Sequence, residues 1–246
     1  MPATDRVAVV TGGGSGIGRA AGLALAGSGH RVVFAGRTVE TLQESVDLAG
    51  SGEVIAVDVT DEDAVNSAFD HLDRIDVLVN SAGVFGAQKP IAQTSLHEWS
   101  QTMTVNVTGS FLCARAAMAV MGEQGGGRII NIGSISAQVP RPEATPYTAS
   151  KFAITGLTRA LALEGRAHGI AVGQIDIGNA ATEMIAGFGG TSQDGALQPD
   201  GSRRPEPKFD VRHVGSTIAH IAALPTDVSV PFLTIMATGM PFLGRG

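Results

Sequence analysis

A glycine-rich segment near the N-terminus places the strongest constraint on what this chain can fold into. Residues 11–18 follow the pattern Thr-Gly-x-x-x-Gly-x-Gly, after an apolar run at 7–10 and before an alanine- and leucine-rich stretch at 19–26. This order predicts a buried strand, a tight turn and a helix. Glycines let a backbone approach a pyrophosphate closely, and the amide N–H groups at a helix N-terminus attract its charge. The alternative is a glycine-rich hairpin or helix cap.

Apolar runs and helical stretches continue to alternate along the chain. The runs predict strands at 32–35, 54–57, 77–79, 129–132, 170–177 and 230–237, and the stretches between them predict helices at 39–48, 61–72, 96–121, 145–163 and 210–224. The helix at 96–121 is expected to break or bend near Gly109. This alternation favours an α/β fold, a doubly wound parallel sheet of about seven strands with helices on both faces. We expect a single domain over residues 1–246, because no repeat or linker interrupts the pattern.

Charge and composition exclude several function classes. The net charge of -6 argues against a nucleic acid or an acidic membrane surface as a partner. The single cysteine, Cys113, rules out an intrachain disulfide and favours a reducing compartment, so we expect a cytoplasmic protein. The N-terminus lacks the apolar segment of a signal peptide, and no apolar run reaches about 18 residues, so no membrane span is expected. No metal site is predicted.

Three residues between 129 and 163 have the chemistry of a proton-transfer site. Ser134 follows an apolar run, and Tyr147-x-x-x-Lys151 lies on the predicted helix, where residues four apart share a face. A free phenol has a pKa of about 10, and a nearby ammonium lowers it toward the range in which a general acid/base works best. Ser134 would hold a substrate oxygen against the phenol. The alternative is a Tyr and a Lys on an ordinary helix, with Ser134 as a turn residue.

The end of the second predicted strand indicates which cofactor would bind. In dinucleotide-binding folds an acid near this point binds the adenosine ribose hydroxyls, but here the residues are Gly36 and Arg37. Glycine leaves room for a 2′-phosphate, and Arg37 offers it a forked, charged donor, so the sequence favours NADP(H) over NAD(H). Asp58, after the third predicted strand, either accepts a hydrogen bond from the adenine amino group or caps the next helix.

Several motifs in a fixed order connect these segments to a known family. They are Thr11-Gly12-x-x-x-Gly16-x-Gly18, Asn80-x-Ala82-Gly83, Asn106, Ser134, Tyr147-x-x-x-Lys151, and Gly178 with Thr182. Over residues 6–239 the chain resembles the short-chain dehydrogenases/reductases of the compact single-domain kind. The resemblance implies a Rossmann-type fold and an NAD(P)-dependent oxidoreductase that interconverts an alcohol and a carbonyl compound by hydride transfer. A non-catalytic dinucleotide sensor or scaffold on the same fold is the alternative.

The resemblance also implies a role for each motif. Tyr147 would be the general acid/base, and Ser134 would position the substrate oxygen. Lys151 would lower the pKa of Tyr147 and bind the nicotinamide ribose, while Asn106 would support a proton-relay water. The expected cofactor contacts are Gly12, Ser15, Gly16, Ile17, Gly18, Arg37, Asp58, Val59, Asn80, Ala82, Gly83, Tyr147, Lys151, Gly178, Asn179 and Thr182. An epimerase or dehydratase is disfavoured, because little sequence remains for a larger C-terminal substrate domain.

The chain departs from the family at two positions and leaves its substrate open. Ser81 stands where the family usually has a second Asn, and Ile177 stands where it usually has proline before Gly178. The glycine- and proline-rich stretch within 183–209 predicts a substrate lid. A mostly apolar pocket, suited to an apolar or modestly polar carbonyl compound, is expected from Phe85, Ile135, Ser136, Gln138, Val139, Met184 and Phe188. The family implies a homotetramer, with a dimer as the alternative, through the helices at 96–121 and 145–163.

Overall fold

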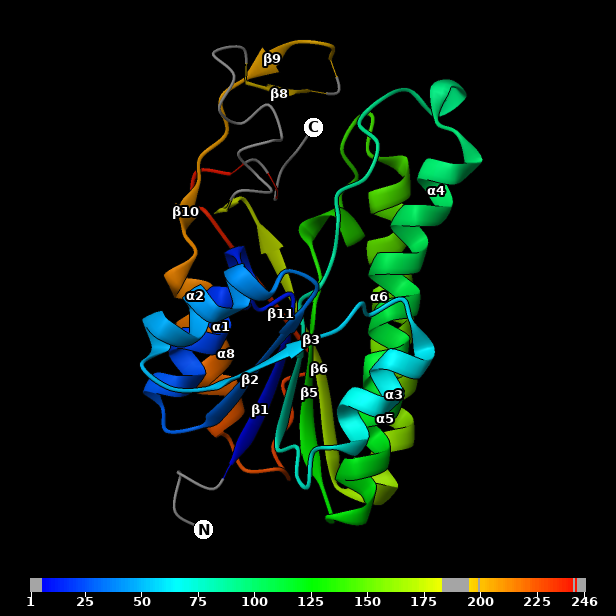
Figure 1. Ribbon diagram of the computed structural model, residues 1–246. Helices are drawn as coiled ribbons and strands as arrows, with labels where there is room; N and C mark the ends of the chain where they lie inside the picture. Colours follow the sequence, from blue (N-terminus) through cyan, green and yellow to red (C-terminus); the bar gives the residue numbers. More distant parts are fainter. Residues whose placement is uncertain (1–5, 183–194, 199, 241, 243–246) are drawn as a thin grey trace.

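Seven parallel strands form the central sheet of the protein (Figure 1). The computed structural model describes residues 6–182, 195–198, 200–240 and 242. The strands lie in the order β11-β6-β5-β4-β1-β2-β3, and every neighbouring pair is parallel. Their bounds are β1 Val7–Thr11, β2 Arg31–Gly36, β3 Glu53–Ala56, β4 Val77–Asn80, β5 Gly127–Ile132, β6 Ile170–Gly178 and β11 Phe232–Met236. The predicted doubly wound parallel sheet is confirmed.

Helices cover both faces of this sheet. The first layer, at the left in Figure 1, consists of α1 Gly16–Gly27, α2 Val39–Ala49 and α8 Arg212–Ala223. The second layer, at the right, consists of α3 Glu62–Asp70, α4 Leu96–Met103, α5 Gly109–Glu123 and α6 Thr145–Glu164. Helices of these layers connect one parallel strand to the next, because two parallel strands can be joined only by a crossover that passes over a face of the sheet.

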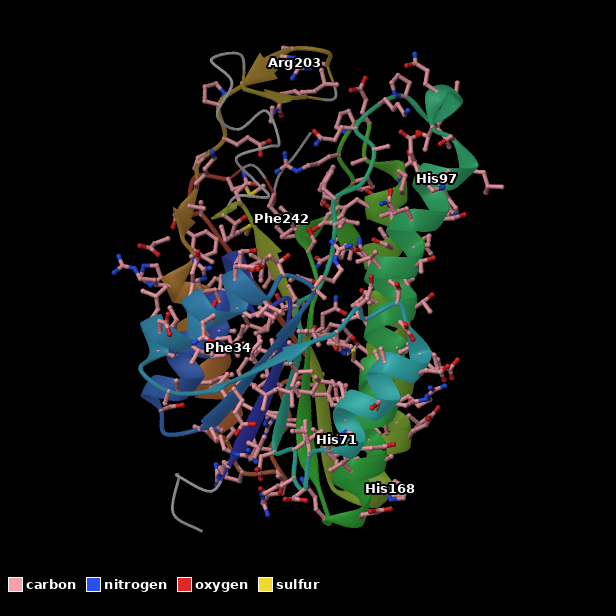
Figure 2. The ribbon with its side chains drawn as sticks, viewed as in Figure 1. Phe34, His71, His97, His168, Arg203 and Phe242 are labelled. Atoms are coloured by element: carbon pink, nitrogen blue, oxygen red, sulfur yellow. The ribbon has the colours of Figure 1, made fainter. Side chains whose placement is uncertain are left out.

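Two hydrophobic clusters join the sheet to its helical layers. Successive strand residues point to opposite faces, so Val9 and Val33 enter the cluster beneath α3, α5 and α6, while Val10 and Phe34 enter the cluster beneath α1 and α8. Phe34 is fully buried between the sheet and the first layer (Figure 2). Because both faces are covered, the strands are mostly apolar, and this is why short apolar runs predicted them correctly.

The long helix predicted at 96–121 is interrupted, as expected near Gly109. After α4, Thr104–Thr108 form a single π-helical turn before α5 begins at Gly109. The whole helical run, Leu96–Glu123, is long and apolar enough to cross a membrane by length and composition alone. Within the fold, α5 packs against α3 and the sheet, so core packing accounts for its apolar side chains. π-turns of this kind occur most often at functional sites, and this one contains Asn106.

The carboxyl ends of the parallel strands lie along one edge of the sheet. The order in which the chain adds strands reverses at β1. From β1 the order proceeds to β2 and β3 on one side and to β4, β5 and β6 on the other. Above this edge, β7 Ala180–Ala181 pairs with β10 Phe209–Asp210, and β8 Ala196–Leu197 forms an antiparallel hairpin with β9 Arg203–Arg204 (Figures 1 and 2). The predicted lid therefore contains some regular structure. Met184 and Phe188, with the rest of 183–194, lie outside the described residues.

Candidate active site

A cleft opens at the carboxyl ends of β1, β4, β5 and β6, beside the reversal point of the sheet. Its lining includes the glycine-rich turn, the residues that follow β4, and the predicted catalytic residues Ser134, Tyr147 and Lys151. A second cavity, lined by Arg37, Asp58 and Val59, adjoins it through shared glycine-turn residues. In open α/β sheets, ligands bind in the crevice at this reversal point. The predicted cofactor contacts in the main cleft are Gly12, Ser15, Gly16, Ile17, Gly18, Ala82, Gly83, Gly178, Asn179 and Thr182.

The glycine-rich turn has the shape needed to cradle a phosphate. Gly12 has φ +65°, and a Cβ built on it would come within 2.9 Å of Ala82 Cα. A Cβ on Gly18 would come within 2.1 Å of the Gly12 carbonyl oxygen. Ser15 is the N-cap residue of α1, yet its side chain makes no capping hydrogen bond. The turn therefore directs a helix N-terminus and a serine hydroxyl into the cleft, and these groups fit a dinucleotide pyrophosphate.

The second cavity places Arg37 and Asp58 close together. Arg37 makes no hydrogen bond or ion pair within the described residues, although its charge helps to lower the pKa of Asp58. The main cause of that lowered pKa is the backbone N–H of Thr60, which donates to Asp58 Oδ1 at 2.9 Å. The side chain that caps α3 belongs to Asp61 instead. The capping interpretation of Asp58 is therefore wrong, and its position facing the second cavity leaves the adenine contact as the remaining hypothesis.

Ser134, Tyr147 and Lys151 converge in the main cleft, as the sequence predicted. Ser134 lies just after β5 and lines the cleft together with Tyr147, whose pKa the Ser134 hydroxyl acts to lower. Tyr147 stacks on Phe85 with the ring centroids 4.3 Å apart. One helical turn further on, Lys151 Nζ donates to the Ile132 carbonyl oxygen at 2.7 Å and lies 5.6 Å from the centre of the Tyr147 ring. The strand end and the helix thus bring all three polar groups to one place.

The electrostatics of this trio differ from the sequence-based expectation. Burial raises the pKa of Tyr147, against the opposing effects of the Ser134 hydroxyl and the charge of Arg141. Burial lowers the pKa of Lys151 to about 8, against the charge of Asp176. The expectation that Lys151 draws the pKa of Tyr147 toward neutral is wrong here, because burial outweighs the effects that lower this pKa. The Lys151 amine is turned toward the Ile132 carbonyl. Tyr147 therefore keeps its proton at neutral pH in this state of the protein.

Asn106 and Asn80, which the sequence predicted as site residues, are buried and form hydrogen bonds to other parts of the fold. Asn106 Nδ2 donates to the Val84 carbonyl and to Ser150 Oγ, each at 2.9 Å, while its Oδ1 accepts from the Val84 N–H at 2.8 Å. The π-turn thus holds the loop after β4 against α6, beside Tyr147. Asn80 Nδ2 donates to Asn131 Oδ1 and to the Ser110 carbonyl. Asn80 lies outside the lining of both cavities, because its amide is turned into the sheet.

Asp176 is a buried carboxylate, absent from the sequence predictions, next to the predicted catalytic trio. It lies on β6 with 3% of its surface exposed. Its Oδ1 accepts from the Ser134 N–H at 3.1 Å and from Gln174 Nε2 at 2.7 Å, and its Oδ2 accepts from Gln138 Nε2 at 2.9 Å. The detectable signal was the pair of polar residues inside the apolar run 170–177. Asp176 anchors the backbone of Ser134 and raises the pKa of Tyr147 and of Lys151.

The part of the main cleft around Phe85 also carries charged side chains, which the sequence did not predict. Phe85, Ile135 and Ser136 line it, but Gln138 and Val139 do not, since Gln138 is turned toward Asp176. Three charged residues that the sequence analysis did not consider line it as well, namely Arg141, Glu206 and Lys208. Arg141 comes from the loop between β5 and α6, whereas Glu206 and Lys208 come from the segment between β9 and β10, and no local pattern marks them. The apolar residues Phe85 and Ile135 line the cleft as expected, and the charged residues are an addition to the expected lining.

Comparison with known proteins agrees with this geometry. The family model for short chain dehydrogenase matches residues 6–191. The chain belongs to the short-chain dehydrogenase/reductase family. A 3-oxoacyl-[acyl-carrier-protein] reductase from Synechocystis sp. is 37% identical to this dehydrogenase/reductase over 190 residues, which cover 74% of this chain and 76% of the relative.

Solved structures of other proteins superpose on this dehydrogenase/reductase over almost its whole length. An actinorhodin polyketide ketoreductase with NADPH superposes with a TM-score of 0.84 at 27% identity, covering 95% of this chain and 97% of that one. A closed form of serine dehydrogenase complexed with NADP⁺ superposes with a TM-score of 0.86 at 25% identity, covering 98% of each chain. These two oxidoreductases therefore share the architecture of this chain over almost its whole length.

Proposed function

We propose that this short-chain dehydrogenase/reductase interconverts an alcohol and a carbonyl compound with NADP(H) as its preferred cofactor and Tyr147 as its acid/base. The observation that carries the proposal is the position of Ser134 and Tyr147 as a pair in the cleft that the glycine-rich turn borders. A proton donor and a phosphate cradle in one cleft are what a dinucleotide-dependent reduction needs. A non-catalytic sensor would have no use for this pair, so we favour the enzyme.

The residues of the chain can handle the proton and the substrate oxygen. A bound nicotinamide dinucleotide supplies or accepts the hydride. Burial keeps the proton on Tyr147, so the phenol can donate it to the oxygen of a carbonyl group that is being reduced. The hydroxyl of Ser134 would hold that oxygen beside the phenol. The Ser134 hydroxyl and the charge of Arg141 both favour the phenolate that remains, which allows the reverse reaction to proceed through the same groups.

The preference for NADP(H) rests on the second cavity. Arg37 faces it beside Thr38, and Gly36 contributes no acid that would repel a 2′-phosphate. The guanidinium has no competing partner within the described residues, so it can point at a phosphate. Two structural neighbours contain NADPH or NADP⁺, which supports the same choice. We infer that Arg37 recognises the 2′-phosphate through charge-assisted hydrogen bonds.

Replacing Tyr147 with phenylalanine tests the acid/base assignment. The ring would keep its stacking on Phe85, so only the hydroxyl is lost. We expect kcat/KM for the reduction of a panel of ketones with NADPH to fall by about 10²–10⁴-fold, the usual contribution of general acid/base catalysis. Binding of NADPH, measured by its fluorescence, should change little. Turnover of the variant at a third or more of the wild-type rate would contradict the assignment.

Thr148→Val provides a matched control for this experiment. Thr148 is adjacent on α6, and its buried hydroxyl has no hydrogen-bond partner within the described part of the chain. Its removal should leave the rate within about threefold of wild type. Absence of any NADPH oxidation by the wild-type protein, across aliphatic, cyclic and acidic ketones, would instead reject the oxidoreductase activity itself.

A further inference from the structure

The hydrogen-bond ladder between β5 and β6 ends where the chain leaves the sheet toward Ser134. The last pair in register is Ile132 with Ile175, and the N–H of Gly133 donates to the Ile175 carbonyl oxygen at 2.9 Å. The next N–H, that of Ser134, donates to a side-chain oxygen, Asp176 Oδ1, at 3.1 Å. A carboxylate of β6 thus takes the place of a backbone acceptor and fixes the point at which Ser134 leaves the sheet.

The Asp176 carboxylate lies directly against the backbone at Gly133. A Cβ on Gly133 would overlap Asp176 Oδ1 and come within 2.7 Å of Gln174 Nε2, so glycine is what leaves room for both side chains. Asp176 makes no ion pair within the described residues. Its partners are the Ser134 N–H and the side-chain amides of Gln174 and Gln138. All of these partners donate, as a buried carboxylate without a countercharge requires.

A chain of buried amide and hydroxyl groups leads away from Asp176, and the carboxylate fixes its direction. Because an ionised carboxylate only accepts, Gln174 must turn its NH2 group toward Asp176, and Nε2 donates to Oδ1 at 2.7 Å. Gln174 Oε1 then accepts from the Thr158 hydroxyl at 3.0 Å. That hydroxyl accepts from Asn131 Nδ2 at 2.9 Å, and Asn131 Oδ1 accepts from Asn80 Nδ2 at 3.0 Å. Every bond of the chain donates toward Asp176, so each polarises and strengthens the next.

One side of α6 carries both the predicted catalytic pair and the contacts to Gln174. Four residues lie along this side at steps of four, four and three residues: Tyr147, Lys151, Thr155 and Thr158. Gln174 Nε2 donates to Thr155 Oγ1 at 3.0 Å, while Oε1 of the same amide accepts from Thr158. Gln174 and Asp176 therefore contact α6 on one side and the turn of Ser134 on the other.

We propose that Gln174 and Asp176 form a positioning clamp, which holds the turn of Ser134 against the catalytic side of α6. The proposal deepens the oxidoreductase function proposed above and rests on it. Ser134 and Tyr147 come from different segments, and their hydroxyl groups must keep a fixed separation to act on one substrate oxygen. Neither residue of the clamp is among the described residues that line the main cleft, so both act through Ser134 and Tyr147 rather than on the substrate.

Moving the carboxylate between two neighbouring positions tests the contact with Ser134. Asp176→Asn introduces an NH2 group where every partner is a donor, so at least one of these contacts is lost. We expect kcat for ketone reduction to fall by about 10- to 150-fold, the value of one hydrogen bond to a charged group, while NADPH binding changes little. Adding Gln138→Glu gives that NH2 group an acceptor, so the double variant should recover about fivefold or more. In the wild-type background Gln138→Glu brings two carboxylates together and should not raise kcat.

The contact with α6 is tested at Thr158. Thr158→Val keeps the shape of the side chain but leaves Gln174 Oε1 without its donor and Asn131 Nδ2 without its acceptor. We expect kcat to fall by about fivefold or more, with NADPH binding unchanged. Thr158→Ser retains the hydroxyl and should stay within about threefold of wild type. Thr148→Val is the matched control, because its buried hydroxyl on the same helix has no partner within the described part of the chain.

Two outcomes would overturn the clamp while the oxidoreductase function stands. One is an Asp176→Asn variant that retains more than a third of the wild-type kcat, and the other is a Gln138→Glu change that has the same effect in both backgrounds. If circular dichroism shows that Asp176→Asn does not fold, the comparison at Thr158 decides, and equal rates for its valine and serine variants would overturn the proposal. A wild-type protein that reduces no ketone would reject the oxidoreductase function instead.

Discussion

Two adjacent residues at the end of β2 are expected to set the cofactor preference, and a double substitution should invert it. The change is Gly36→Asp together with Arg37→Ile. A Cβ on Gly36 would meet Leu42 at 3.5 Å, an ordinary contact, so an aspartate fits at this position. Arg37 has no hydrogen bond or ion pair in the described structure, so its replacement breaks no contact that stabilises the fold.

The size of the change in cofactor preference follows from the hydrogen bond between Arg37 and the 2′-phosphate. A hydrogen bond to a charged group contributes roughly 1.5–3 kcal/mol. At about 1.4 kcal/mol per tenfold change, Arg37 should give NADPH about a 10- to 150-fold advantage over NADH in kcat/KM. In the double variant this advantage disappears, and the new carboxylate accepts hydrogen bonds from both ribose hydroxyls of NADH while it repels a 2′-phosphate. The ratio should therefore move below one.

The assay compares kcat/KM for NADPH and for NADH at one fixed carbonyl substrate in wild type, both single variants and the double variant. Gly36→Ala, with Arg37 retained, is the matched control because it adds a Cβ without a charge, and it should keep the preference for NADPH. The kcat/KM for NADPH should fall more steeply with ionic strength than the kcat/KM for NADH, since salt partly screens the contact between Arg37 and the phosphate. A wild-type preference for NADH, or an unchanged ratio in the double variant, would show that Arg37 does not read the phosphate.

The remaining predictions concern Asp176 and assembly. Asp176 raises the pKa of Tyr147 and of Lys151, so Asp176→Asn should lower both and move the alkaline limb of the pH–rate profile for reduction to lower pH. Asp210→Asn is the control at the surface and should leave the alkaline limb in place. An Asp176→Asn variant whose alkaline limb does not move would contradict this role. We also expect a homotetramer through α5 and α6, where Phe111 and Phe152 are 42% and 49% exposed, and Phe152→Glu should weaken it. A monomeric mass for the wild type in light scattering at micromolar concentration would refute the assembly.

Local features of the sequence were enough for the framework of the fold. A parallel strand covered on both faces must be apolar, so its run is visible without knowledge of its neighbours. The glycine-rich turn was predictable because the backbone at Gly12 and Gly18 tolerates no side chain. Tyr147 and Lys151 were placed together by the period of one helix. Even the break near Gly109 was predicted, although its form as a π-turn around Asn106 was not.

The tertiary structure alone decided the charges and partners within the site. Arg141, Asn179 and Glu206 are brought together from three loops, and neither their contact nor their turn into the cleft has a local signal. The direction of the pKa shift of Tyr147 was predicted wrongly, because burial is a property of the folded environment and here it outweighs nearby positive charge. Sequence periodicity fixes which residues share an element, whereas desolvation and the pairing of side chains across elements depend on how those elements pack.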